Sequence, residues 1–153
     1  PLKDAAMFSI YTGLRLGDII DLKWGDIRVA PDGKPCIKKK RRKCRREITI
    51  LVSENALRFC GVRMPNDFPV FRDFKRSMTK GPLEKWIEDS GIQKHITFHC
   101  FRHTHATLLL TKGVDIYTVS GMLTHTNVKT TQIYAHLVDS KKRSAAEVIE
   151  NII

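Results

Sequence analysis

Apolar residues recur with helical spacing over most of the 153-residue chain and alternate with polar residues in one short region. The first periodic stretch predicts a helix that begins near Ala6 and ends at Gly13. A second helix is expected to open at Gly17. Arg15 therefore falls in the sharp turn between two helices.

The pattern changes to short β segments between residues 27 and 51. Pro31-Asp32-Gly33 is a turn sequence, and it separates an apolar stretch from the segment in which Ile48 and Ile50 alternate with polar residues. These features predict a small antiparallel sheet of two or three strands.

Helical periodicity returns after Ser53, which is placed to cap a helix. Further helices are expected over residues 53–60, 80–89, 98–111, 116–123, 127–136 and 140–152, with residues 61–76 as a loop. No internal repeat, low-complexity segment or Gly/Ser linker divides the chain, and its length fits one domain. We therefore predict a mainly α fold with a small antiparallel β-sheet, of the α+β class, in a single domain over residues 1–153.

Positive charge is concentrated in one segment. The chain has a net charge of +11 at pH 7, and nine of its 27 lysines and arginines lie between Lys34 and Arg46. Cations placed near phosphates release condensed counterions, so the segment favours a nucleic acid or an anionic membrane surface as partner. Basic runs are also common in disordered tails, but this one lies between two apolar stretches, where a dangling tail is not expected.

The four cysteines, Cys36, Cys44, Cys60 and Cys100, form no Cys-x-x-Cys pair, and no secretory leader precedes them. This usage is typical of a reducing, cytosolic compartment without disulfides. No apolar run approaches the roughly 20 residues that span a bilayer, so we expect a soluble protein with no membrane partner. The chain opens at Pro1 without an initiator Met, and we expect it to be a piece of a longer protein.

The densest polar cluster in an otherwise apolar helical stretch runs from His99 to His105. His99 and Arg102 are three residues apart and share one helix face. A guanidinium fork can hold two phosphate oxygens while an imidazole handles a proton, so the pair suits phosphoryl chemistry. Taken alone, such residues are more often surface groups or satisfied core groups.

A metal site is a competing interpretation, because His99 and His103 stand four residues apart, as in helical zinc sites. No glutamate adjoins His99, the cysteines are scattered, and Arg102 between the two imidazoles would repel a dication. We therefore predict no metal and no cofactor.

Further along, His125 precedes Tyr134 by nine residues, on either side of an expected helix start. Val128 and Ile133 account for that helix without a functional role. A lone tyrosine at a helix end is usually half-buried packing. In isolation, neither His125 nor Tyr134 indicates a function.

Three segments together resemble the sequence boxes of one family, in order and in spacing. They are Thr12 to Trp24 around Arg15, His99-x-x-Arg102-His103-Thr104-His105, and Leu123-Thr124-His125 through Gln132-Ile133-Tyr134. The chain resembles the catalytic domain of a tyrosine recombinase, also called the phage integrase family, over nearly all of its length. Each box alone can arise by chance, whereas three in order make the resemblance specific.

The resemblance implies an enzyme that cleaves and rejoins DNA through a 3′-phosphotyrosyl intermediate, without ATP, metal or cofactor. It assigns Tyr134 as the nucleophile and places Arg15 and Arg102 at the non-bridging oxygens of the scissile phosphate. His99 would be a general base or hydrogen-bond partner, and His125 a further donor to the phosphate.

The resemblance also gives roles to other charged residues. Asp18 looks like the family's acidic support, which orients neighbouring groups. A lysine of the β-hairpin would protonate the departing 5′-oxygen, and aligning residues 47–50 with the following strand selects Lys43. Lys40 stays the alternative, because Cys44 and Arg45 replace the usual small turn residues. The cations expected to bind backbone phosphates without reading sequence are Lys38, Lys39, Lys40, Arg41, Arg42, Arg45 and Arg46.

Two features depart from the family pattern. The residue before His125 is usually glycine and here is Thr124. The amino-terminal DNA-clamping domain of such recombinases is absent from these 153 residues, so we expect this domain alone to recognise a full site weakly. Neither departure removes a catalytic group.

The implied partner is double-stranded DNA. We expect the protein to be a monomer in isolation and to bind DNA as a homotetramer during recombination. Accessory DNA-bending proteins are further expected partners. We expect a cytoplasmic protein that is bacterial or phage-encoded and that serves a phage or a mobile element. The last expected helix, residues 140–152, would either dock on a neighbouring protomer or pack on its own.

Two alternative functions stay open. One is a type IB topoisomerase, which uses the same chemistry to relax supercoils. The other is a catalytically inactive DNA-binding module of the same fold, which would not need the complete set of Arg15, His99, Arg102, His125 and Tyr134.

Overall fold

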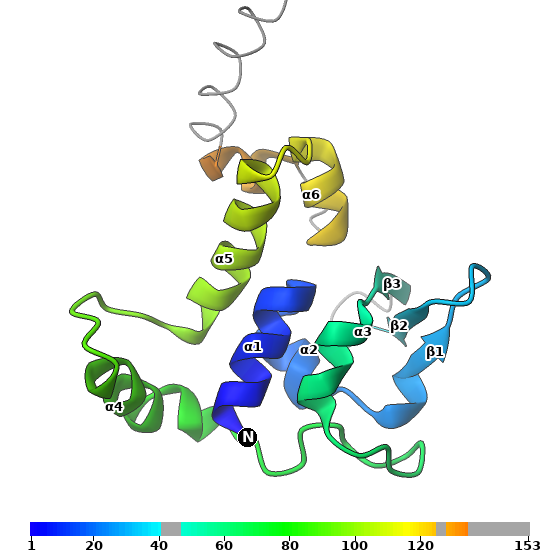
Figure 1. Cartoon of the computed structure of the whole chain (residues 1–153), viewed down its shortest axis with the longest axis horizontal. Coiled ribbons are helices and arrows are strands. Elements are labelled where there is room, and N and C mark those ends of the chain that lie inside the picture. Colours follow the sequence, from blue (N-terminus) through cyan, green and yellow to red (C-terminus); the bar gives the residue numbers. More distant parts are fainter. Residues whose placement is uncertain (41–46, 125–127, 135–153) are drawn as a thin grey trace, which may run out of the picture. The chain divides into compact units, whose positions relative to one another are not determined.

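The computed structural model describes residues 1–40, 47–124 and 128–134, and the chain divides into two compact units, Pro1–His105 and Ala106–Ile153 (Figure 1). The first unit contains α1 (Leu2–Thr12), α2 (Leu16–Ile20), β1 (Ile27–Val29), β2 (Pro35–Lys40), β3 (Glu47–Leu51), α3 (Glu54–Leu57), α4 (Gly81–Asp89), the beginning of α5 (Phe98–Thr111), and 3-10 turns at Trp24–Asp26, Arg58–Cys60 and Arg76–Thr79. The second contains the end of α5, α6 (Ile116–Met122) and 3-10 turns at Val128–Thr130 and Gln132–Tyr134.

The sheet has three antiparallel strands in the order β1-β2-β3. Ile27 pairs with Ile37, and Ile37 with Ile50, so one face of the sheet is a row of buried isoleucines. The mainly α fold with a small antiparallel sheet confirms the predicted fold class.

Local chemistry sets several helix ends where the sequence predicted them. Gly13 ends α1 with its N–H donating to the Ser9 carbonyl at 2.8 Å. The Ser53 hydroxyl caps α3 by accepting the N–H of Ala56 at 3.2 Å. The predicted helix over residues 53–60 continues past Leu57 only as a 3-10 turn.

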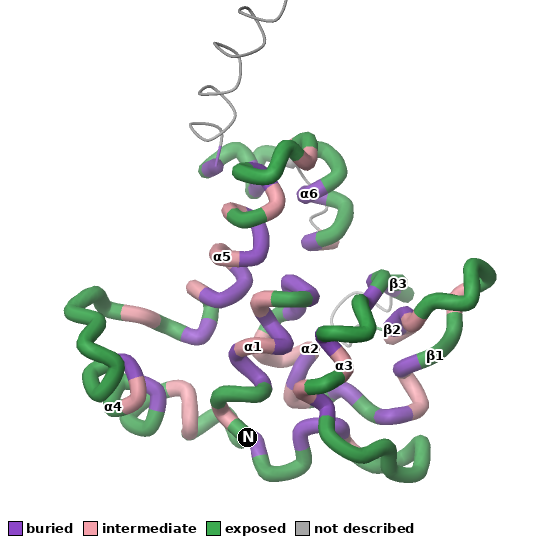
Figure 2. Tube along the Cα trace, in the orientation of Figure 1, coloured by how far each residue is buried: buried purple, intermediate pink, exposed green. Residues whose placement is uncertain are grey.

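The core of the first unit draws buried residues from α1, the sheet, α4 and the start of α5, and Figure 2 shows buried stretches on each of these elements. Aromatic side chains contribute several of its contacts. The ring of Phe8 lies 5.2 Å from that of Phe71, and Phe98 lies 5.3 Å from both Phe74 and Phe101, measured between centroids. Because Phe98 and Phe101 are buried on α5, the residues between and beside them are held in fixed positions.

The described residues of the second unit, 106–124 and 128–134, contribute a core of their own. Ala106, Leu110, Val119, Leu123 and Tyr134 form it. The carboxylate of Asp115 caps α6, since its Oδ1 accepts the N–H of Thr118 at 2.9 Å.

One predicted helix is wrong within the described residues. The expected helix over residues 127–136 is instead two 3-10 turns, Val128–Thr130 and Gln132–Tyr134, separated by buried Thr131. The β-branched residues in this segment restrict side-chain rotamers in a helix and so lower its helix propensity. The expected helix over residues 140–152 lies outside the described part of the chain.

The boundary between the compact units falls within α5, and the assignment of residues 1–153 to a single catalytic domain stays a prediction. No helix in the described ranges is long and apolar enough to cross a bilayer. Cys36, Cys60 and Cys100 are free thiols, and burial raises the pKa of Cys60 to about 12. Cys60 is therefore an unreactive thiol at neutral pH.

Candidate active site

Arg15 is placed by a turn that buried hydroxyl groups hold in shape. Gly13 adopts a φ of +67°, which turns the chain out of α1 at a residue without a side chain. The Ser9 hydroxyl donates to the Leu14 carbonyl at 3.0 Å, and the Leu14 N–H donates to the Thr12 hydroxyl oxygen at 3.3 Å. Arg15 follows as the residue that caps the amino end of α2.

Arg102 is docked onto the same turn. Its side chain is buried on α5, with 4% of its surface exposed, and its Nη1 donates to the Gly13 carbonyl oxygen. A buried guanidinium needs such partners because removing the charge from water is costly. The bond ties α5 to a carbonyl only two residues from Arg15 and fixes how Arg102 is oriented.

Arg15, His99 and Arg102 line one small pocket of about 210 Å³ in the first unit. The other lining residues are Leu14, Leu16, Thr79, Thr97 and Phe98. Three of the predicted catalytic residues, from segments more than eighty positions apart, are thus brought together. Two guanidinium groups on one pocket suit an anion with several oxygens.

The environment of His99 keeps its imidazole neutral. Burial lowers the pKa of His99, and the charges of His103, Arg102 and Arg15 lower it further. The His99 and His103 rings meet edge to face with centroids 4.5 Å apart. A neutral imidazole at physiological pH can accept a proton or a hydrogen bond, as a general base requires.

A second, larger pocket of about 810 Å³ adjoins Arg15 on the side of α2 and β2. Its charged lining residues are Arg15, Asp18, Asp21, Lys23, Asp26, Lys39, Lys40 and Arg76. Asp18 and Lys40 were predicted to take part in the site, whereas Lys23 and Arg76 were not. Arg76 lies at the end of a segment read as a loop, where no periodicity distinguishes one cation from another.

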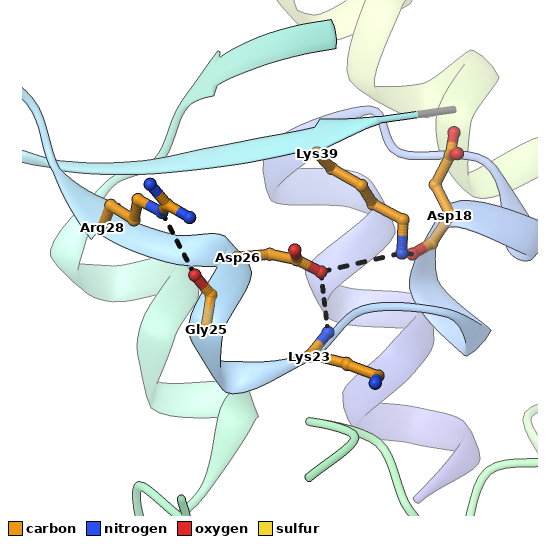
Figure 3. Close-up of polar contacts among 6 residues, drawn as sticks. All are labelled: Asp18, Lys23, Gly25, Asp26, Arg28 and Lys39. Atoms are coloured by element: carbon orange, nitrogen blue, oxygen red, sulfur yellow. Dashed lines mark hydrogen bonds and ion pairs between the residues drawn. The ribbon is translucent and has the colours of Figure 1, made fainter. Parts of the chain in front are cut away.

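The three described lysines at the end of β2 differ in their surroundings. Lys38 is partly exposed and Lys40 is exposed. The side chain of Lys39 is only 10% exposed, and its ammonium faces Asp26 and the backbone of Asp18 (Figure 3). The other predicted members of the basic run, Arg41, Arg42, Lys43, Arg45 and Arg46, lie outside the described residues.

Tyr134 belongs to the second unit, where it ends the Gln132–Tyr134 3-10 turn and packs against the buried residues of that unit. Its N–H donates to the Thr131 carbonyl at 3.0 Å. Thr124 adopts a φ of +52°, which accounts for the preference for glycine before the histidine of this box. His125 itself lies outside the described residues.

Metal binding gains no support from the geometry of the described residues. Within residues 1–40, 47–124 and 128–134, no three His, Cys, Asp or Glu side chains gather as metal ligands. His99 and His103 contact each other. Burial lowers the pKa of both imidazoles, the positive charge of Arg102 lowers it further, and the same charge disfavours a dication.

A mainly α fold that sets two arginines and a neutral histidine around one pocket defines a candidate phosphoryl-transfer protein. Residues 1–141 match the phage integrase family, and the chain belongs to that family. The resemblance inferred from the three sequence boxes is thereby confirmed.

Curated relatives are named tyrosine recombinases. One from Thermosipho africanus is 29% identical, with 95% of this chain and 53% of the relative covered. One from Pseudothermotoga lettingae is 34% identical, with 94% of this chain and 52% of the relative covered. Tyrosine recombinase XerD from Listeria monocytogenes is 30% identical, with 89% of this chain and 50% of the relative covered. The chain thus spans about half the length of the curated relatives it matches.

Solved structures share the fold. XerA recombinase matches with a TM-score of 0.67 and 27% identity over 94% of this chain and 59% of that one. XerH recombinase bound to its palindromic difH substrate matches with a TM-score of 0.72 and 21% identity, over 97% and 45%. The catalytic domain of bacteriophage HP1 integrase matches with a TM-score of 0.67 and 20% identity, over 95% and 80%.

Proposed function

We propose that the chain is the catalytic domain of a site-specific DNA recombinase that cleaves and rejoins double-stranded DNA through Tyr134. The observation that carries the proposal is the single pocket lined by Arg15, His99 and Arg102. Membership of the phage integrase family supports it, as do curated relatives named tyrosine recombinases. Those names favour strand exchange over supercoil relaxation by a type IB topoisomerase.

The two arginines would stabilise the charge that develops on the scissile phosphate. Arg102 is held by its bond to the Gly13 carbonyl, so its guanidinium needs little reorganisation during the reaction. Arg15 is exposed at the end of α2 and would close on the phosphate from the same pocket. A planar guanidinium can bind two oxygens at once, which a lysine cannot do.

In the proposed reaction the phenolic oxygen of Tyr134 attacks phosphorus, and the bond from phosphorus to the 5′-oxygen breaks. His99 accepts the phenolic proton, and a lysine gives a proton to the leaving 5′-oxygen. Lys43 is the proposed acid, with Lys40 as the alternative, since Lys40 is exposed and lines a pocket with Arg15. The reverse attack by a 5′-hydroxyl restores the phosphodiester without an energy source.

The remaining proposals concern assembly and setting. Exposed cations around Arg15 would bind backbone phosphates, and four protomers would assemble on two duplexes, with DNA-bending proteins assisting. XerH and the Tn1549 transposon integrase, which share this fold, were solved in complex with DNA, and this supports a duplex as this chain's partner. We place the protein in the cytoplasm of a bacterium, encoded by a phage or mobile element.

The test is covalent trapping on a pool of nicked duplexes with a randomised centre. The wild-type chain should form an adduct that survives SDS, whereas Tyr134→Phe should form none and keep its DNA affinity. Tyr117→Phe is the matched control, because Tyr117 is an exposed tyrosine of the same unit and should react normally. Equal trapping by wild type and Tyr134→Phe would rule out the proposed nucleophile.

A further inference from the structure

Lys39 is turned toward the interior by the register of the sheet. Lys39 pairs with Ile48, while Lys40 pairs with Glu47 and Lys38 with Thr49. Side chains alternate between the two faces of a strand, so Lys39 shares the buried isoleucine face, and its two neighbours share the other. Ile48 is buried and Thr49 and Glu47 are exposed, which agrees with this assignment.

The Lys39 ammonium joins two oxygen atoms on that face (Figure 3). Its Nζ lies 3.8 Å from Oδ2 of Asp26, and it donates to the backbone carbonyl of Asp18 at 3.5 Å. The same Asp26 oxygen accepts the N–H of Lys23 at 3.0 Å, which orients the carboxylate toward Lys39. Three structural elements, α2, the Trp24–Asp26 turn and β2, therefore meet at one ammonium group.

The contact with Asp18 bears on Arg15 because both belong to α2. Arg15 caps this helix, and its carbonyl accepts the N–H of Ile19 at 3.0 Å. A five-residue helix is too short to be stable by its own hydrogen bonds, and carbonyls near its carboxyl end need partners from outside. Lys39 supplies such a partner and holds α2 against the sheet.

A mostly buried cation with two oxygen partners differs from the exposed cations of the same segment. Reaching a solvent-side phosphate would require Lys39 to give up its contacts with both the Asp26 carboxylate and the Asp18 carbonyl. Lys40 is exposed and can approach a phosphate without breaking such contacts. The one strand thus carries two lysines with different tasks.

We propose that Lys39 is a positioning residue for Arg15, acting through α2, and is not one of the phosphate contacts of the basic segment. The proposal rests on the proposed function, because the role of Arg15 belongs to that function. It removes Lys39 from the set of DNA-binding cations expected from the sequence.

The experiment compares Lys39→Met with Lys40→Met on the duplex enriched by covalent trapping. At saturating DNA, Lys39→Met should slow single-turnover adduct formation by about 10- to 100-fold, as expected when a reactive group is misplaced. Its slope of log binding constant against log salt should stay at the wild-type value. Lys40→Met should lower the magnitude of that slope by about 0.9, the loss of one phosphate contact.

Two further variants separate positioning from other roles. Lys39→Arg keeps the charge and should recover most of the rate, whereas Asp26→Asn should slow the reaction as Lys39→Met does. Asp26→Asn also serves if thermal melting shows that Lys39→Met does not fold. A substrate with sulfur at the bridging 5′ position should not rescue Lys39→Met, because protonation of the leaving group is not the step that the substitution impairs.

The proposal is overturned if Lys39→Met keeps the wild-type rate and lowers the salt slope, or if the 5′-thio substrate restores its rate. It is equally overturned if Asp26→Asn reacts at the wild-type rate. Failure of the proposed function looks different, since the wild-type chain itself would then form no adduct.

Discussion

Arg102 and Tyr134 are both buried residues that the proposed function assigns to one reaction, and their described surroundings differ. Arg102 lies in the large core of the first unit and is oriented by a directional hydrogen bond to the Gly13 carbonyl. Among the described residues of the second unit, Tyr134 packs with Ala106, Leu110, Val119 and Leu123. A hydrogen bond constrains direction as well as distance, so the bond to the Gly13 carbonyl fixes the orientation of the Arg102 guanidinium in a way that apolar packing alone does not.

The turns beside these residues differ in the same sense. Gly13 and Thr124 both adopt positive φ angles, +67° and +52°. Glycine does so without steric cost, whereas a β-branched threonine is strained there. The turn at Gly13 is therefore free of this strain, whereas the backbone at Thr124 carries it.

The largest expected effect comes from replacing the rigid arginine. Arg102→Lys should lower the rate of covalent adduct formation by about 10²- to 10³-fold, since a lysine cannot satisfy the Gly13 carbonyl and two phosphate oxygens together. Arg28→Lys is the control, because Arg28 is exposed on β1 and lines neither pocket that contains Arg15. Near-normal rates for Arg102→Lys would refute the rigid-anchor account.

A smaller effect is expected from the turn that anchors Arg102. Gly13→Ala should destabilise the protein by about 1 kcal/mol, because alanine disfavours positive φ, and it should also slow cleavage. Gly33→Ala carries the same backbone penalty in an open surface turn, with a φ of +78°, and should leave the cleavage rate unchanged. The comparison fails if both variants slow cleavage equally. Urea unfolding and single-turnover kinetics provide the two readouts.

Acid should weaken the first unit. Burial lowers the pKa of His105, and the charge of Arg102 adds to this, although the bond between His105 Nδ1 and the Ile10 carbonyl, at 2.8 Å, opposes it. Below the unfolded-state pKa of about 6.5, the unfolded chain binds a proton that the folded chain does not. The free energy of unfolding should therefore decrease as pH falls below that value and level off above it.

The measurement is urea unfolding at about pH 7.5 and about pH 5.5, on either side of the ordinary histidine pKa. His105→Gln keeps a donor for the Ile10 carbonyl and should lose less stability on acidification than the wild type. His99 and His103 also have lowered pKa values and contribute in the same direction. Equal losses in wild type and variant would show that His105 is not the group responsible.

The smallest expected effect relieves the strain in the second unit. Thr124→Gly should raise stability by about 0.5–1 kcal/mol, because glycine adopts the positive φ freely, offset in part by the greater entropy of the unfolded chain. Thr118→Gly, in the first turn of α6, should instead destabilise the protein, because glycine lowers helix propensity and the bond from the Thr118 hydroxyl to Asp115 is lost. A loss of stability in Thr124→Gly would mean that side-chain contacts of Thr124 outweigh the backbone strain.

Features that depend on neighbouring residues could be predicted from the sequence. The stop at Gly13, the turn position of Arg15 and the cap by Ser53 follow from local backbone preferences and short-range hydrogen bonds. The shared helix of His99 and Arg102 follows from periodicity. These residues also carry the family resemblance, so the sequence alone predicts Arg15, His99 and Arg102 as residues of the site.

Features that depend on long-range packing could not be predicted in the same way. The inward direction of Lys39 requires the register of β2 against β3, and the lining role of Arg76 requires the path of a loop. The hydrogen bond from Arg102 to the Gly13 carbonyl joins residues 89 positions apart. The alternation of Ile48 and Ile50, continued across the hairpin, was the one signal that pointed to a buried position for Lys39.

The central claim is that Tyr134 forms the bond to DNA. The most direct measurement is mass spectrometry of proteolysed adducts from the trapping reaction, with the nucleotide-bearing peptide sequenced to the modified residue. We predict a single modified site, Tyr134, linked through phosphate to the 3′ end of the cleaved strand. Modification of Tyr117, Tyr11 or any other residue, with Tyr134 unmodified, would contradict the account.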